Sequence, residues 1–169
     1  MDNINTKEIA KCGLMAALTF IFTYTFKIPS PNGYTHLGDC FVLLGVLVLG
    51  RKKGALAGGI GAALSDLLGG YMVWVLPTFF IKAIMAYVMG TIVEKVMPEN
   101  KFNYIIGACI GGIIQIVLYT LVKIPLFGAV YAVTRVPGLT IQTISGIILT
   151  VIIVSVLDKA HVLKFVKEM

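Results

Sequence analysis

The chain has 169 residues, of which 58% are hydrophobic and 13% are charged, with a net charge of +6 and a mean hydropathy of +0.94. These values lie outside the range of a soluble domain of this length, and they indicate an integral membrane protein. The positive residues are spread over several connections and form no single stripe, which argues against a nucleic-acid partner.

Six apolar stretches are candidates for crossing a bilayer, which predicts an all-α membrane protein with six transmembrane helices: residues 9–26, 37–50, 54–68, 75–96, 104–122 and 138–157. A crossing helix needs about 20 apolar residues, so we expect the second and third stretches to be tilted, broken or partly buried. The connections are too short for a soluble domain, and we therefore predict one integral membrane domain over residues 1–169. A cleaved signal peptide is not expected, because its removal would leave an odd number of crossings.

Positive charge predicts the orientation, because connections rich in Lys and Arg tend to stay in the cytoplasm. The two ends of the chain and the second and fourth connections hold most of these residues: Lys7, Lys11, Arg51, Lys52, Lys53, Lys95, Lys101, Lys159, Lys164 and Lys167. The opposite connections hold only Lys27, Lys123 and Arg135. Both termini are therefore expected in the cytoplasm of a multi-pass protein of the cell membrane.

Small residues share one face of the first stretch. Gly13 and Ala17 are four residues apart, with Cys12 and Ala16 beside them. This spacing gives a smooth helix face against which another helix packs closely. The other helix belongs either to this chain or to a partner subunit, and the spacing alone does not choose between them.

The connection 27–39 is predicted on the outer side, and its prolines and glycines favour turns over helix. It carries Tyr34, His36 and Asp39, which are candidates for closing over a bound molecule. A loop histidine is more often merely solvated, so His36 has two interpretations.

Polar residues inside the apolar stretches fall at one depth. With a rise of about 1.5 Å per residue, Asp66, Lys82, Gln115 and Gln142 lie about 6 to 10 Å below the outer ends of their helices. An ionised side chain at membrane depth costs at least about 2.5 kcal/mol, so we expect these four residues to meet in a buried polar site. Asp66 and Lys82 form either a structural pair or a pair of ligand contacts. The two glutamine amides favour ligand contacts, because a closed ion pair does not require them.

Further candidates share the helix faces of these residues. Thr78 lies four residues before Lys82, and Tyr119 lies four residues after Gln115. Trp74 lies at the predicted outer mouth, where an aromatic side chain is more often a membrane anchor than a ligand contact. The sequence therefore predicts a cavity suited to a small, flat, hydrogen-bonding solute of little net charge.

The sequence holds no arrangement expected for catalysis, for ATP use or for a cofactor. It has no HExxH motif, no phosphate-binding loop and no nucleophile with a histidine placed to activate it. The three cysteines lack metal-binding spacing and are expected as small packing residues: Cys12, Cys40 and Cys109. We therefore expect a transport or binding subunit rather than an enzyme.

Several motifs together resemble one family of transport proteins. They are His36-Leu37-Gly38-Asp39, the Leu-Gly-Arg-Lys-Lys-Gly turn at 49–54, the Gly-Ile-Gly-Ala-Ala-Leu-Ser-Asp-Leu-Leu run at 59–68, and Thr78 with Lys82. The chain is similar over essentially its whole length to the substrate-binding S components of energy-coupling factor (ECF) vitamin transporters. Within this family it most resembles the branch for hydroxymethylpyrimidine or vitamin B6.

The resemblance implies a six-helix subunit that captures a vitamin from outside and then docks on one transmembrane T subunit and two ATPases. It also implies that the small-residue face at Gly13 and Ala17, with Cys12 and Ala16, contacts the T subunit, and that the whole subunit topples in the membrane when its partners use ATP. Fold does not fix the substrate. The alternatives are an S component for riboflavin, thiamine, folate, pantothenate or cobalamin, or a stand-alone secondary transporter or channel.

Overall fold

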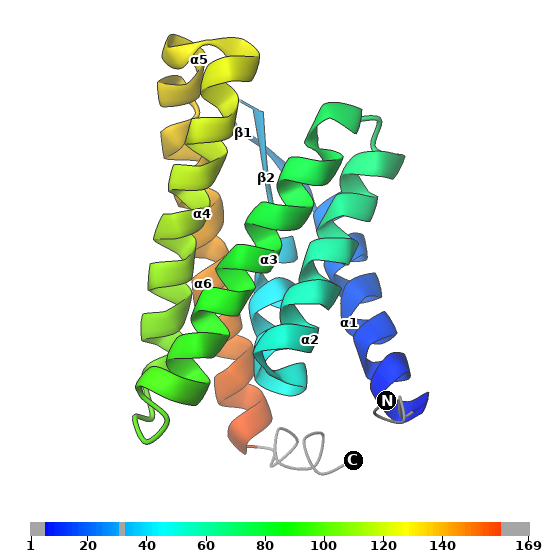
Figure 1. Ribbon diagram of the computed structural model, residues 1–169, viewed down its shortest axis with the longest axis vertical. Helices are drawn as coiled ribbons and strands as arrows, with labels where there is room; N and C mark the ends of the chain where they lie inside the picture. Colours follow the sequence, from blue (N-terminus) through cyan, green and yellow to red (C-terminus); the bar gives the residue numbers. More distant parts are fainter. Residues whose placement is uncertain (1–5, 31–32, 160–169) are drawn as a thin grey trace.

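The computed structural model is a bundle of helices whose axes run roughly side by side (Figure 1). It describes residues 6–30 and 33–159. The helices are α1 (Thr6–Tyr24), α2 (Gly38–Leu68), α3 (Val75–Thr91), α4 (Asn103–Phe127), α5 (Ala129–Thr134) and α6 (Val136–Lys159). A short 3₁₀ turn, η1 (Met72–Trp74), leads into α3, and a π-helical turn, η2 (Ile92–Val96), extends it.

Helix α2 consists of two arms, residues 38–49 and 51–68, which reverse direction at Gly50. Gly50 has φ 79° and ψ 170°, a backbone conformation that residues with a Cβ rarely adopt. The arms pack so closely that a Cβ on Gly54 would lie 2.6 Å from the Cα of Val46. The turn predicted between the second and third apolar stretches is therefore confirmed. So is the burial of these short segments, because α2 contacts α1, α3 and α6.

The connections alternate between the two ends of the bundle (Figure 1). The start of α1, the reversal between the two arms of α2, the connection at 97–102 and the end of α6 lie together at one end. We call the opposite end, where the two strands lie, the hairpin end. Within residues 6–30 and 33–159, three segments are long and apolar enough to cross a membrane: Met72–Val96, Asn103–Phe127 and Ala129–Lys159. The membrane class agrees with the sequence, whereas the number of crossings and the orientation stay predictions.

Two short strands depart from the all-helical expectation. β1 (Lys27–Ser30) and β2 (Gly33–His36) pair antiparallel, with Ile28 opposite Thr35. Pairing satisfies backbone groups that an irregular loop would leave to water, so this connection is an ordered hairpin and not a run of turns. Strand β2 contacts α1 and α6, which fixes the hairpin to the bundle.

Helix α4 extends beyond the predicted stretch of 104–122. It continues to Phe127 with Pro125 in its last turn, and it ends at Gly128, whose φ is 89°. Pro125 removes one helical hydrogen bond, because it has no backbone N–H to donate to the carbonyl four residues earlier, and the helix ends two residues after it. The short helix α5 follows, and the sequence did not predict it. Both additions lengthen the bundle at the hairpin end.

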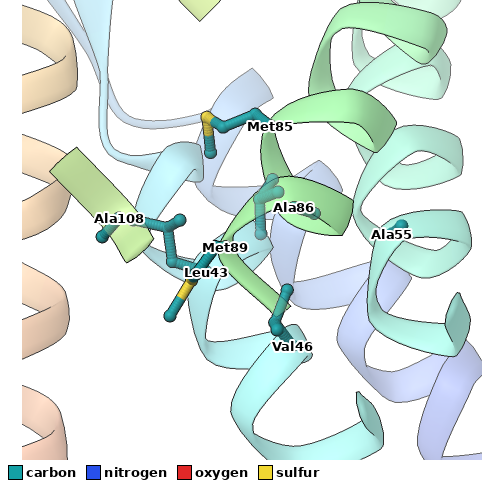
Figure 2. Close-up of a cluster of buried hydrophobic side chains, with 8 residues drawn as sticks. Leu43, Val46, Ala55, Met85, Ala86, Met89 and Ala108 are labelled. Atoms are coloured by element: carbon teal, nitrogen blue, oxygen red, sulfur yellow. The ribbon is translucent and has the colours of Figure 1, made fainter. Parts of the chain in front are cut away.

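An apolar core joins α2, α3 and α4 (Figure 2). Its buried residues are Val42, Leu43, Val46, Ala55, Met85, Ala86, Met89 and Ala108. Figure 2 shows Leu43 and Met89 close together beside Ala108. Large apolar side chains such as Leu76 and Val130 are exposed on the outside of the bundle, as expected for a surface that faces lipid.

The cysteine prediction holds for one residue and fails for another. Cys40 is fully buried beside the core, whereas Cys109 is exposed on α4. Cys12 is half-buried. The exposed thiol is tolerated because the outer face of an apolar helix meets lipid rather than water, and cysteine is a weakly polar side chain.

Candidate functional site

The polar residues lie on the same helix faces as the apolar core, one turn nearer the hairpin end. Asp39 precedes Leu43 by four residues on α2, and Lys82 precedes Met85 by three on α3. Residues at these spacings share a helix face, so the faces that build the core also bring the polar side chains together. Gln115 on α4 joins them, and like both charged residues it is almost completely buried.

Five side chains form a closed hydrogen-bonded cluster, which we call the polar network: Asp39, Lys82, Gln115, Gln142 and Thr143. The Nζ of Lys82 donates to Oδ1 of Asp39 and, at 2.6 Å, to Oε1 of Gln115. The Nε2 of Gln115 donates to Oδ2 of Asp39 and to Oγ1 of Thr143, both at 2.9 Å. The Nε2 of Gln142 donates to the same Asp39 oxygen at 3.2 Å. Such extensive hydrogen bonding is what makes a buried ion pair tolerable.

The network changes the predicted partner of Lys82. Lys82 forms its ion pair with Asp39, and each of the two residues is 1% exposed. Asp66 instead lines the cavity described below. The two acids lie on different arms of α2, and Asp66 lies nearer the hairpin end than Asp39, which belongs to the network beneath the cavity. The polar side chains meet as predicted, but Lys82 pairs with Asp39 and not with Asp66.

A cavity of about 190 Å³ opens at the hairpin end, above the polar network. It is lined by residues from β2, from helices α2 to α6 and from the segments between them: His36, Asp66, Tyr71, Trp74, Thr78, Tyr119, Lys123, Tyr131, Arg135, Leu139 and Gln142. The hydroxyl of Tyr119 donates to Oγ1 of Thr78 at 3.2 Å, which joins α4 to α3 in the cavity wall. Aromatic faces and hydrogen-bonding groups together suit a small aromatic ligand.

Aromatic rings and cations alternate along this wall. The Nζ of Lys123 lies 4.9 Å from the ring centroid of Tyr119 and 5.1 Å from that of Trp74. From the other side, the Nζ of Lys82 lies 5.6 Å from the Tyr119 ring. The Trp74 ring also stacks on Phe127, with centroids 5.8 Å apart. These contacts hold the rings in place, because a cation near an aromatic face is attracted to it.

Most of the residues predicted for the site are brought together. Six of them line the cavity: His36, Asp66, Trp74, Thr78, Tyr119 and Gln142. Lys82 and Gln115 lie beneath it, where they are satisfied by the polar network. The side chain of Tyr34 lies outside the described part of the chain.

Asp39 and His36 were predicted to lie in a loop that closes over a bound molecule, but both are buried in fixed elements of the structure. The loop was predicted to run from residue 27 to residue 39, but α2 begins at Gly38. Asp39 therefore lies in the first turn of that helix. His36 is buried at the end of β2, with its Nδ1 3.9 Å from Oδ1 of Asp39, so the solvated interpretation of His36 is wrong. The hairpin thus contributes to the cavity wall through His36.

Sequence reasoning missed the second pair of charges at the cavity. Lys123 and Arg135 both line it, together with Tyr131. Lys123 follows Tyr119 by four residues and therefore shares its helix face. The spacing of four residues could have identified Lys123 as a site residue. It did not, because the fifth apolar stretch was predicted to end at residue 122, which left Lys123 in a loop.

The small-residue face of α1 is divided between two environments. Gly13 and Ala17 are exposed, and a Cβ added to Gly13 would meet no atom within 4 Å. Cys12 and Ala16 are half-buried, and the backbone of Ala16 packs against Gly61 of α2. Packing within this chain thus accounts for one side of the face and leaves the other side open.

Comparison with known proteins gives a family and two relatives. The family model for "ECF-type riboflavin transporter, S component" matches residues 3–159. A protein of Pyrococcus woesei, described as "uncharacterized protein in gap 3' region", is 33% identical over 122 residues, which cover 72% of this chain and 80% of that protein. The "thiamine precursor transporter HmpT" of Lactococcus lactis subsp. cremoris is 31% identical over 93 residues, which cover 53% of this chain and 56% of HmpT. The resemblance found in the sequence motifs is confirmed.

Proposed function

Because the chain belongs to the family of ECF-type S components, which are transporter subunits, we propose that it captures a small aromatic vitamin or vitamin precursor outside the cell and delivers it through an ATPase-driven importer. Hydroxymethylpyrimidine, a precursor of thiamine, is the first candidate substrate. The similarity to HmpT and the motifs of the sequence both favour it. Vitamin B6 and riboflavin follow as candidates.

The observation that carries this proposal is the cavity above the polar network. It opens at the end of the bundle that the positive-inside rule assigns to the outside. Its wall offers the aromatic faces of Trp74 and Tyr119 for a ring. Thr78, Gln142 and Asp66 offer donors and acceptors for polar substituents of that ring.

We assign two roles to the buried polar residues. The residues that line the cavity contact the ligand, with His36 from the hairpin side. Asp39, Lys82 and Gln115 position these contacts from below, since Gln142 both lines the cavity and donates to Asp39. Tyr34 belongs to the same hairpin and is proposed to help cover the bound ligand.

The sequence has no phosphate-binding loop of its own, so any use of ATP must belong to another chain. We propose six crossings with both termini in the cytoplasm, and docking on a T subunit that is associated with two ATPases. The open side of the α1 face, at Gly13 and Ala17, is the proposed contact with the T subunit. Toppling of the whole subunit would then release the ligand inside.

A thermal-unfolding screen of the purified chain in detergent tests the substrate class. A ligand at a hundred times its Kd adds about 2.7 kcal/mol of stability, so hydroxymethylpyrimidine should raise the unfolding temperature measurably. The panel includes pyridoxine, pyridoxal, riboflavin, thiamine, folate, pantothenate and cobalamin. If none of these compounds stabilises the chain, the proposed function is wrong.

A liposome assay tests the need for partners. The chain alone should bind the ligand without accumulating it, whereas reconstitution with a T subunit and ATPases should give ATP-dependent uptake. Uptake by the chain alone would instead identify a secondary transporter or channel.

A further inference from the structure

The charges that line the cavity are unequal. Lys82 is neutralised by Asp39 within the polar network, so it does not balance the acid in the cavity wall. The wall contains one carboxylate, from Asp66, and two cationic groups, from Lys123 and Arg135. The sequence had suggested a balanced cavity because it assigned Lys82 to Asp66. The structure replaces that balance with an excess of positive charge.

Within the described part of the chain, Lys123 forms no ion pair with a carboxylate. It is 6% exposed, and its Nζ contacts the faces of Trp74 and Tyr119. Among residues 6–30 and 33–159, the carboxylates that form ion pairs take other partners, and none pairs with Lys123 or Arg135. A lysine that merely extends to the membrane surface keeps its ammonium in water, whereas Lys123 is buried beside the cavity.

Arg135 adds a second positive charge to the same cavity. Its guanidinium lies 6.0 Å from the ring centroid of Tyr131, which also lines the wall. Two cations beside one cavity repel each other, and an anion placed between them removes that repulsion. Arg and Lys are also the side chains that proteins use to bind phosphate and carboxylate groups.

From this arrangement we infer that the ligand of the cavity carries an anionic substituent, a phosphate monoester or a carboxylate, which Lys123 and Arg135 bind while its aromatic ring lies against Trp74 and Tyr119. This inference rests on the proposed function, since it specifies the charge of the same aromatic ligand. It makes a phosphorylated or carboxylated ring a better ligand than the neutral ring alcohol or amide.

Two matched pairs of compounds test the inference, with the full chain in detergent and in a buffer free of phosphate. They are hydroxymethylpyrimidine with its monophosphate, and nicotinamide with nicotinate; inorganic phosphate serves as an anion without a ring. In at least one pair the anionic member should bind at least about tenfold more tightly, as expected for one charge-assisted hydrogen bond. The pair that shows the preference distinguishes phosphate from carboxylate.

Variants connect the preference to the two cations. Lys123→Met and Arg135→Gln should each remove most of the preference for the anionic compound. Lys123→Arg keeps the positive charge and should keep the preference, so it tests the role of charge even if the Lys123→Met variant folds poorly. Lys101→Met is the matched control, because Lys101 also lies over an aromatic ring, 5.1 Å from that of Phe102, but is exposed in a distant connection. The control should bind every compound as the wild type does.

The outcomes separate this inference from the proposed function. Neutral members that bind as tightly as the anionic members, or a Lys123→Met variant that weakens both equally, overturn the inference and leave the aromatic-vitamin function standing. Binding of inorganic phosphate without binding of any aromatic compound supports the anion site but rejects the proposed function. Absence of all binding rejects both.

Discussion

Replacement of Lys82 by Met should destabilise the folded chain strongly. The substitution removes the only cation that contacts Asp39 in the described polar network and leaves a carboxylate that is 1% exposed. Breaking a buried pair in this way costs about 3 to 5 kcal/mol. For a chain of this size each kcal/mol corresponds to about 2 to 4 °C, so the unfolding temperature should fall by about 6 to 20 °C.

A second variant identifies the cause of that loss. Asp39→Asn combined with Lys82→Met removes both charges, and the amide of residue 39 still accepts hydrogen bonds from Gln115 and Gln142. The double variant should recover at least about 2 kcal/mol relative to Lys82→Met alone, since an uncompensated buried charge is no longer present. Lys101→Met, at an exposed position, should stay within about 0.5 kcal/mol of the wild type.

Two measurements on the same samples give the answer. Thermal unfolding in detergent without ligand reports stability, and calorimetric titration with the ligand found in the screen reports affinity below the unfolding temperature. Because Lys82 does not line the cavity and acts on the ligand only by positioning Gln142 through Asp39, affinity should fall by no more than about tenfold. A Lys82→Met variant that unfolds like the wild type but loses binding would refute this reasoning, as would a double variant no more stable than the single one.

Three other substitutions test packing, the partner face and the Gly50 reversal. Gly146→Val should cost about 1 to 3 kcal/mol in thermal unfolding, because a Cβ there would lie 2.7 Å from the Cβ of Asp39; an unchanged unfolding temperature would contradict this close contact. Gly13→Val should leave the stability of the isolated chain within about 0.5 kcal/mol but prevent co-purification with the T subunit, and a retained complex would exclude the proposed face. Glu94→Gln should cost less than about 1.5 kcal/mol in thermal unfolding. It weakens the 3.3 Å ion pair with Arg51 but keeps an acceptor for the Arg51 N–H at 2.7 Å, and a larger loss would mean that the reversal depends on this charge.

Helix faces were predicted well because they depend on local spacing. Thr78 and Lys82 lie four apart on α3, as Gln115 and Tyr119 do on α4, and all four are buried facing the interior of the bundle. A helix repeats every 3.6 residues whatever surrounds it, so such pairs are visible in the sequence. The turn at Gly50 was visible for a similar reason, since a short polar sequence separates two apolar stretches.

The ends of helices were predicted less well, and the error had consequences for the site. Hydropathy ended the fifth stretch at residue 122, but α4 continues to Phe127 and carries Lys123 into the cavity wall. Similarly, α2 begins at Gly38, which turns Asp39 from a loop residue into a buried partner of Lys82. Where a helix ends depends on packing and capping as well as on hydropathy, so a charged residue does not by itself mark the end.

By itself, the sequence determined the membrane class, the apolar segments, the face that each polar residue occupies and the resemblance to S components. Only the tertiary structure decided which acid neutralises Lys82 and which charges remain for a ligand. Asp39 and Asp66 lie on different arms of α2, and hydropathy had placed Asp39 in a loop, so local spacing did not show which acid meets Lys82. The choice depends on which arm directs its acid toward Lys82, and that is a property of helix packing rather than of local sequence.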